Sequence, residues 1–450
     1  MTVRDDRGER TRSSWWCVAA TFVAVVVVHG RNLGTGFVFD DYTWLEIRPS
    51  SIADVVRTFR PPGGAGVYRP LLDLWFSSMS VVFGRADPFP YHLFALAMAL
   101  AAALAVRWMC LELGITMLPA TVAGIFVGTH GSLVITTRWV SAMPSLPTAA
   151  CAAVAIALVQ RPGRLRHLSA AGFLVVAILW RDSAVVVPAL ATILLVARPG
   201  HRVRDALAAT AELWAVSLAY GILRLADGGL GGGNDAYRSE LGPHVIDNLA
   251  TILRYTARFG MYRRPGTLES VLMTFLVLVF WGVIVGGSVW AAARRRYLPV
   301  AGLVGFLIGI MPFLGLVYHS METYYVEVGI LGLAVTVGAL VDAVAPRTTV
   351  IVAGTVLFVV VQAVAADVVA ERHWIRQVAT RTSVLVDYAH HADIHHGTLV
   401  VEEACAKDEQ FSRSGALFRV VLDRPDLRVR YHVLAPGAAP KTRWGCGRLP

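Results

Sequence analysis

Residues 15–41, WWCVAATFVAVVVVHGRNLGTGFVFDD, decide the fold. Their apolar part, about Trp15 to His29, is long for the core of a signal peptide, lacks a small-residue cleavage site and precedes many further apolar segments. It therefore predicts a first membrane helix that is retained in the protein. The acidic pair Asp40 and Asp41 follows about ten residues beyond the end of this helix, beside aromatic residues typical of a membrane interface.

The composition of the whole chain extends this interpretation. Of its 450 residues 56% are hydrophobic and only 16% are charged, against about 25% in an ordinary soluble domain, and the mean hydropathy is +0.57. These values exclude a soluble enzyme. A membrane span needs about 20 apolar residues, and further candidate spans lie near 90–111, 117–134, 144–160, 168–180, 183–197, 207–224, 270–292, 299–318, 325–345 and 348–366. We expect an all-α polytopic membrane protein with about 11 transmembrane helices.

The arginines predict the orientation of these helices. With a cytoplasmic N-terminus, 14 arginines fall in inside segments: 4, 7, 10, 12, 161, 164, 166, 198, 202, 204, 294, 295, 296 and 347. The short outside turns carry only Arg138 and Arg181. The positive-inside rule therefore predicts a multi-pass protein of the cell membrane with a cytoplasmic N-terminus and an extracytoplasmic C-terminus. The net charge of +10 serves topology here, so no nucleic-acid partner is expected.

Three outward segments are too long and polar to be turns. Two of them, residues 31–87 and 226–269, are loops of a transmembrane domain that spans residues 1–366. In the first loop, SIADVVRTF (51–59) has helical spacing, and YRPLLDLWFSSMSVVF (68–83) is apolar but too short to cross a bilayer. Both predict helices that lie along the membrane surface.

The third outward segment, residues 367–450, has the composition of a small soluble module. It holds 22 of the 72 charged residues of the chain. GTLVVEE (397–403) and LRVRYHVL (427–434) predict strands, and DEQFSRSGALFRVVLD (408–423) predicts a helix that runs into a strand. We therefore expect a small α/β extracytoplasmic domain. Cys405 and Cys446 both lie in it, and either a disulfide or two thiols fits the sequence.

The acidic pair is the sharpest candidate for chemistry. One carboxylate of Asp40 and Asp41 could act as general base on an acceptor hydroxyl, while the other orients the acceptor or helps to hold a divalent cation. A solvated acidic turn is the alternative.

Other polar residues near the outer ends of the helices are candidates for substrate binding. Arg69 could grip a phosphate through its planar guanidinium or could anchor the loop at the interface. His92 enters the next span and could instead be a hydrogen-bonded core histidine. Charge at membrane depth is costly and often functional, and this singles out Arg138, Arg181, Asp182 and Glu322, although Arg181 and Asp182 could simply neutralise each other. Tyr324, in the same turn as Glu322, is a further candidate for substrate binding, although Tyr324 and Tyr325 could simply belong to an aromatic belt.

Five motifs occur in one order: YRPL (68–71), DPFPYH (87–92), RWVS (138–141), RDSAVVVP (181–188) and ETYY (322–325). Together with the acidic pair they resemble the GT-C superfamily of integral-membrane glycosyltransferases. The chain is most similar to the branch that contains the protein O-mannosyltransferases and the related mannosyltransferases with tetratricopeptide repeats, here without the repeats. The resemblance covers roughly the first 200 residues and, more weakly, positions 318–330.

The resemblance implies an inverting transferase that moves a sugar from a polyprenyl-phosphate donor to an acceptor hydroxyl at the outer face. By position, Asp40 matches the catalytic base of the family and Asp41 its acidic neighbour. Arg69, His92 and the pair Arg181 and Asp182 match residues of the same family motifs. Related proteins often carry an arginine and an aspartate after the RWVS segment, where this chain has Met143 and Ser145. This departure argues against a second acidic site on that turn and so against a metal requirement. A divalent cation, Mg²⁺ or Mn²⁺, is kept as an open alternative, and no metal ligand is assigned.

The expected partners are the lipid-linked donor, membrane lipid and an acceptor that is a protein, a glycan or a lipid. The main alternative function is a transporter or flippase of a lipid-linked sugar. Such proteins usually carry ionisable groups near the bilayer midplane within inverted repeats, whereas the charges here gather at the outer helix ends. A non-catalytic envelope scaffold is a third interpretation.

Overall fold

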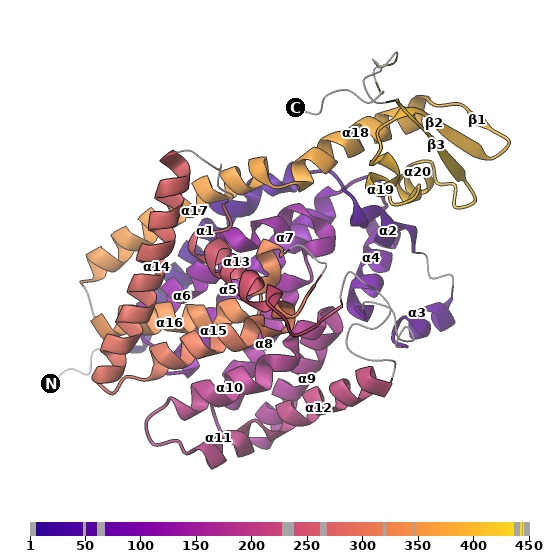
Figure 1. Cartoon of the computed structure of the whole chain (residues 1–450). Coiled ribbons are helices and arrows are strands. Elements are labelled where there is room, and N and C mark those ends of the chain that lie inside the picture. Colours follow the sequence, from indigo (N-terminus) through magenta and orange to yellow (C-terminus); the bar gives the residue numbers. More distant parts are fainter. Residues whose placement is uncertain are drawn as a thin grey trace.

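The computed structural model describes residues 6–47, 51–60, 68–226, 238–261, 268–317, 321–344, 347–435, 442 and 444. Figure 1 shows a large helical body and, at one end of it, a small module that carries one three-stranded sheet. The predicted combination of a helical body and an α/β tail is confirmed.

The chain begins with a long helix, α1 (Asp6–His29), which runs into the first loop. The loop contains η1 (Gly30–Gly34), α2 (Asp40–Glu46), α3 (Ile52–Thr58) and α4 (Pro70–Phe83). The two helices predicted in this loop are confirmed as α3 and α4. Ser51 caps α3 by accepting the Asp54 N–H at 3.2 Å, and Pro70 opens α4 at a position where its missing N–H costs nothing. Helix α2, which starts at the acidic pair, was not predicted.

The rest of the body is built from helices, and several of them pack against helices distant in the sequence. They are α5 (Phe89–Glu112), α6 (Met117–Thr129), η2 (Gly131–Leu133), α7 (Val134–Arg138), η3 (Val140–Ala142), α8 (Ser145–Val159), α9 (Arg164–Trp180), η4 (Asp182–Val186), α10 (Val187–Val196), α11 (Val203–Ala209), α12 (Ala211–Ala226), α13 (His244–Ala257), α14 (Leu268–Ala293), α15 (Leu298–Leu314), η6 (Thr323–Val326) and α16 (Gly329–Val344).

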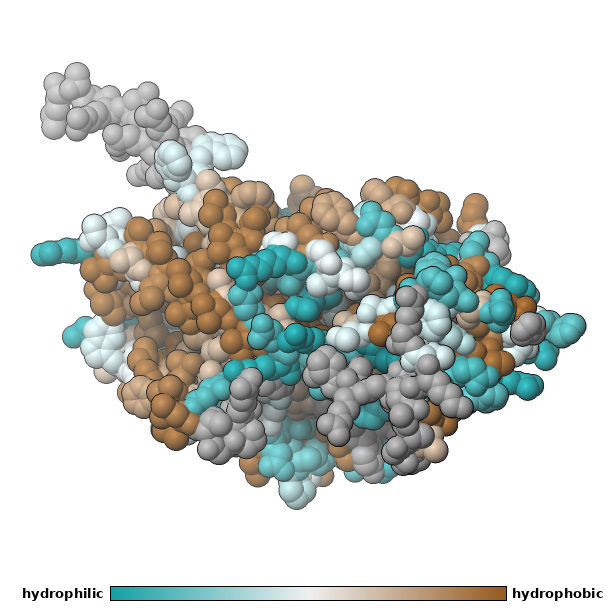
Figure 2. All heavy atoms as spheres, turned by 90° about the horizontal axis from the view of Figure 1, so that it is seen from above, coloured by the Kyte–Doolittle hydropathy of each residue, from teal (hydrophilic) through white to brown (hydrophobic). Residues whose placement is uncertain are grey.

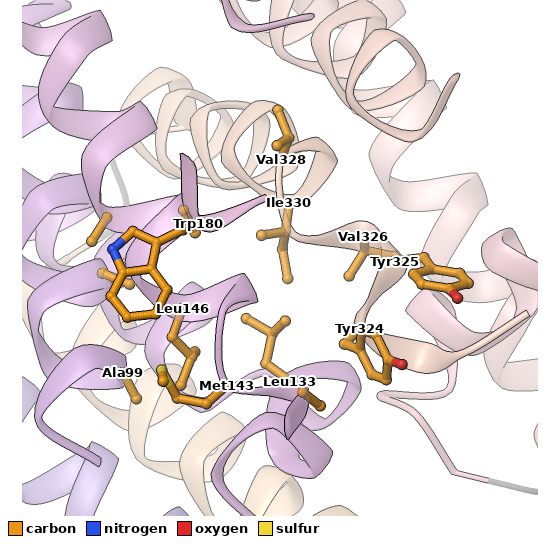
Figure 3. Close-up of a cluster of buried hydrophobic side chains, with 14 of the residues drawn as sticks. Ala99, Leu133, Met143, Leu146, Trp180, Tyr324, Tyr325, Val326, Val328 and Ile330 are labelled. Carbon is orange, nitrogen blue, oxygen red and sulfur yellow. The ribbon is translucent and has the colours of Figure 1, made fainter. Parts of the chain in front are cut away.

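Glycines let two of these helices approach each other. A Cβ placed on Gly302 of α15 would lie 2.5 Å from the Gly332 carbonyl oxygen of α16, so a larger residue could not be accommodated there. Small residues at a helix contact allow the backbones of membrane helices to come close. Figure 3 shows the adjoining core, where Leu133, Met143 and Leu146 gather near Val326 and Ile330. This core underlies the residues described in the next section.

Six helical segments of the described chain are long and apolar enough to cross a membrane: Trp15–Gly34, Phe89–Glu112, Met117–Arg138, Val140–Val159, Leu268–Ala293 and Thr348–Arg372. A seventh candidate is the pair α11 and α12, which bends by 64°. The apolar segments Asp182–Val196, Leu298–Leu314 and Gly329–Val344 are shorter. The chain is therefore a membrane protein, while the count of about 11 spans stays a prediction.

Apolar side chains also cover part of the outside of the body. In the hydrophobic windows of α14 and α17 (Thr348–Arg372), only 6% and 17% of the residues are buried. Figure 2 shows hydrophobic residues gathered in the left part of the molecule and hydrophilic residues mainly in the right part, where Figure 1 places the sheet. This distribution matches a body that faces lipid and a module that faces water.

We call residues 375–435 the C-terminal module. It contains α18 (Ile375–His391), β1 (Ile394–His395), β2 (Thr398–Ala404), α19 (Asp408–Phe411), α20 (Ala416–Val421) and β3 (Arg428–Val433). In the sheet β1 pairs antiparallel with β2, and β2 pairs parallel with β3, with Leu399 opposite Val429. The last apolar helix, α17, continues to Arg372, past the predicted boundary at residue 367.

The predictions for this module were partly wrong. Strands β2 and β3 are where the sequence predicted them, but residues 416–421 form a helix instead of the predicted strand. Gly415 adopts a positive φ of 91° and starts this helix, whose Leu417 and Phe418 are fully buried. Cys405 is disulfide-bonded, whereas Cys446, its partner in one of the two alternatives that the sequence left open, lies outside the described residues.

Candidate active site

Asp41 is completely buried at the start of α2 and fixes that helix to the body. Its Oδ1 accepts hydrogen bonds from the backbone N–H of Ser141 at 2.7 Å and from the Ser141 hydroxyl at 2.5 Å. Its Oδ2 accepts the Val38 N–H at 2.9 Å. Burial raises the pKa of Asp41 to about 7, although these three donors oppose the shift. Asp41 is thus engaged by the protein on both oxygens.

Asp40 has the opposite character, because 30% of its side chain is exposed. Its Oδ1 lies 3.0 Å from Nε of Arg413, in the C-terminal module. The Arg413 guanidinium also lies over the Phe39 ring, 4.8 Å from its centroid, and donates to the Thr43 hydroxyl at 3.2 Å. Of the two acidic residues, Asp40 is therefore the one that an incoming molecule can reach.

Four aromatic rings connect Asp40 with the neighbouring elements. Phe39 contacts Trp374 of the loop before α18 and Trp139 of the loop after α7, with centroids 5.6 and 6.3 Å apart. Trp139 in turn contacts Trp374 at 5.5 Å and Tyr324 at 6.2 Å. Since Asp40 follows Phe39 and Arg138 precedes Trp139, the cluster brings Asp40, Arg138 and Tyr324 to one end of the body.

Glu322 lies in the same region, where neighbouring side chains hold its carboxylate. Its carboxylate accepts a hydrogen bond from the Trp374 indole N–H at 3.0 Å and lies 3.1 Å from Nε2 of His373. Both Glu322 and His373 are buried. Glu322 therefore fixes the junction between α17 and α18, and its predicted role in substrate binding is not needed to explain its burial.

Arg181 forms a second buried centre behind the aromatic cluster. It pairs with Glu327, donates to the Ser145 hydroxyl at 2.5 Å and lies 5.1 Å from the centroid of the Tyr324 ring. The side chains of Arg181 and Glu327 are 4% and 0% exposed. The sequence suggested Asp182 as the partner of Arg181, whereas the structure places Glu327 there. Sequence reasoning missed Glu327, although a carboxylate inside the apolar segment 324–335 is itself a signal.

Arg69 and Asp182 belong to a third polar group at the surface helices. Arg69 precedes α4 and faces Asp73, whose pKa burial raises to about 6 while Arg69 opposes the shift. Arg69, Asp182 and Arg224 of α12 all act electrostatically on Tyr220. Arg224 is buried and was not predicted, because it lies in a part of the sequence without a recognisable motif. Two cations and two carboxylates thus balance each other here.

His92 is buried and has partners on both ring nitrogens. Nδ1 lies 2.9 Å from the Thr137 carbonyl oxygen and Nε2 lies 3.0 Å from the Thr35 hydroxyl. These contacts fasten the loop before the acidic pair to α5 and α7. They favour the structural alternative for His92 over a contact with substrate.

The acidic pair does not form a protein site for Mg²⁺ or Mn²⁺. Asp41 accepts hydrogen bonds on both oxygens, and Asp40 faces Arg413. Among the described residues, no three His, Cys, Asp or Glu side chains lie close enough to hold a metal ion. Because hard cations of this kind need several oxygen ligands, the residues present do not fit such a cation.

Comparisons with known proteins give little further information. No protein-family model and no curated protein matches the chain. Among solved structures, the chain is similar to the oligosaccharyltransferase of Archaeoglobus fulgidus in its apo form, with 12% sequence identity and a TM-score of 0.49. The match covers 93% of this chain and 64% of that one, so the chain spans less than two thirds of that protein. A likeness of this size assigns no function.

Proposed function

We propose that this protein is an inverting glycosyltransferase of the GT-C type. It transfers a sugar from a polyprenyl-phosphate donor to an acceptor hydroxyl at the outer face of the membrane. The motif order of the sequence supports the family, and the mannosyltransferase branch is the best match to that order. The N-terminus lies in the cytoplasm and the C-terminal module outside, in agreement with the arginine distribution and with the disulfide at Cys405.

The observation that carries the proposal is the setting of Asp40. Its side chain is partly exposed and lies beside the Arg413 guanidinium. Asp40 is the first residue of α2, and Asp41, the next residue, is fully buried. A polyprenyl-phosphate sugar presents its reactive anomeric carbon at the membrane surface. An enzyme that uses it needs a base and cations at that depth, and this end of the body supplies both.

In the proposed reaction Asp40 takes the proton of the acceptor hydroxyl as the hydroxyl oxygen attacks the anomeric carbon. The bond between that carbon and the phosphate oxygen breaks, and its electron pair leaves with the phosphate. Guanidinium groups stabilise the negative charge that grows on the departing phosphate. One displacement inverts the anomeric configuration, and no covalent sugar–enzyme intermediate is required.

The neighbouring residues position this base. Asp41 and Ser141 hold the first turn of α2 against η3, so the direction of the Asp40 side chain is set by buried contacts. The ion pair of Arg413 with Asp40 occupies the carboxylate in the free protein. An acceptor hydroxyl therefore has to replace Arg413 before Asp40 can act as a base.

Purified full-length protein in lipid nanodiscs tests the reaction class. It is incubated with a panel of radiolabelled polyprenyl-phosphate sugars and a membrane extract that contains acceptors. A transferase moves label from the lipid to a new glycosidic product. A flippase reconstituted in vesicles would instead move the labelled lipid between leaflets and form no such product. That result would contradict the proposal and favour the flippase.

A further inference from the structure

Arg138 and Arg376 lie close together although they come from different parts of the chain. Arg138 ends α7, and Arg376 lies in the first turn of α18. The rings of Trp139 and Trp374, which stand beside them in sequence, contact each other with centroids 5.5 Å apart. Arg376 is near enough to Arg138 to repel its charge. Arg376 is exposed and Arg138 is half-buried.

Neither arginine has an acidic partner among the described residues. Four carboxylates of this region have other partners: Asp40 with Arg413, Glu322 with His373 and Trp374, Glu269 with Arg372, and Asp408 with Arg381. Two like charges held together without a counter-ion are unfavourable in a partly buried place. Such a pair is stabilised when an anion binds between the two cations.

The other arginines that the sequence offered for phosphate binding differ in this respect. Arg181 is paired with Glu327 and is 4% exposed. Arg69 has Asp73 as a close neighbour, and Asp182 balances the charge of the same group. Of these candidate arginines, Arg138 therefore differs in having a second arginine, Arg376, as its charged neighbour and no acidic partner among the described residues.

We propose that Arg138 and Arg376 together bind the phosphate group of an isoprenoid-phosphate lipid. This inference rests on the proposed function and assigns its phosphate site. Planar guanidinium groups suit phosphate because each can donate two parallel hydrogen bonds. Trp374, two residues before Arg376, contacts the ring of Phe39, the neighbour of Asp40, so a phosphate bound at this pair would hold the sugar near the proposed base.

Binding of farnesyl phosphate, a short isoprenoid phosphate, tests the site in the full chain in phosphatidylcholine nanodiscs. The uncharged alcohol farnesol is the ligand control. We expect Arg376→Ala and Arg138→Ala each to weaken farnesyl phosphate binding about tenfold or more, since each removes charged hydrogen bonds. Farnesol binding stays unchanged. Arg430→Ala, which removes an exposed arginine of β3, leaves both affinities at the wild-type value.

Farnesyl phosphate binding by folded Arg376→Ala at wild-type affinity would overturn the inference. Thermal unfolding verifies the fold of each variant, and Arg376→Gln replaces Arg376→Ala if the alanine variant unfolds. Wild-type sugar transfer is measured in parallel. If the wild type transfers sugar and Arg376→Ala binds farnesyl phosphate normally, the assignment of the phosphate site is wrong and the proposed function stands. If binding depends on the two arginines but the wild type transfers no sugar, the phosphate site is supported and the proposed glycosyltransferase function is wrong.

Discussion

Nε of Arg413 lies 3.0 Å from Oδ1 of Asp40, so the C-terminal module contacts the acidic pair that follows the first membrane helix. A second ion pair, between Arg419 of α20 and Glu46 at the end of α2, lies beside it, with Nη2 and Oε2 3.2 Å apart. The module is therefore attached to the same short helix that carries the proposed base.

The first prediction concerns this attachment. Replacing both Arg413 and Arg419 with alanine should increase hydrogen exchange at the amides of α2 and α20, because both ion pairs between the C-terminal module and α2 are lost. The melting temperature should change little, since partly exposed ion pairs contribute only about 0–1 kcal/mol each. Arg430→Ala is the matched control. Unchanged protection of α2 in the double variant would mean that other contacts attach the module.

Asp41 predicts a pH-dependent stability. Burial raises its pKa in the folded protein to about 7, from 3.8 in the unfolded chain. The folded state therefore keeps the Asp41 proton to a higher pH than the unfolded chain does. The contribution of this proton to the free energy of unfolding is complete below pH 3.8 and is lost as pH rises through 7. The melting temperature of the wild type should fall relative to that of Asp41→Asn between pH 4 and pH 7. A constant difference over this range would contradict the raised pKa.

The buried pair of Arg181 and Glu327 should be sensitive to removal of one partner. Arg181→Met alone should lower the free energy of unfolding by about 3–5 kcal/mol, because Glu327 keeps an uncompensated buried charge. The double variant Arg181→Met with Glu327→Leu should recover most of this loss. Thermal unfolding of the two variants in detergent measures the coupling, and equal destabilisation in both would show that the pair is not coupled.

The reaction should not need a divalent cation. The described residues offer no cation site at the acidic pair, and the guanidinium groups supply positive charge for the phosphate. Sugar transfer by the purified protein should therefore proceed at the same rate with and without chelator. Loss of transfer with chelator and its recovery on adding Mg²⁺ or Mn²⁺ would contradict this expectation.

The topology has a separate test. A periplasmic-type reporter enzyme fused after Pro450 should be active, and a reporter that works only in the cytoplasm should be inactive at the same position. The reverse result would place the C-terminal module inside and would separate it from any donor at the outer face.

Local sequence signals predicted much of this fold. Ser51 and Pro70 mark the starts of α3 and α4, and the alternating patterns of 397–403 and 427–434 mark β2 and β3. The predicted strand in 408–423 was wrong because packing overrode propensity: Val420 and Val421 favour strands, yet the turn at Gly415 and the burial of Leu417 and Phe418 select a helix.

The candidate site was predicted only in part. Asp40, Arg138 and Tyr324 were proposed from their positions at helix ends that the sequence predicts to be outer, and the aromatic cluster brings those ends together. The partners of these residues could not be predicted, because Arg413 and Arg376 come from a module whose docking depends on tertiary contacts. Glu327 and Arg224 were missed since no motif surrounds them.

Sugar transfer by Asp40→Asn tests the central claim most directly. Asn keeps the size of the side chain and removes the base. Folded Asp40→Asn should therefore transfer sugar at least about a hundredfold more slowly than the wild type. Asp426→Asn, which changes an exposed aspartate of the C-terminal module, should transfer sugar at the wild-type rate. Transfer by folded Asp40→Asn at the wild-type rate would contradict the assignment of Asp40 as the base.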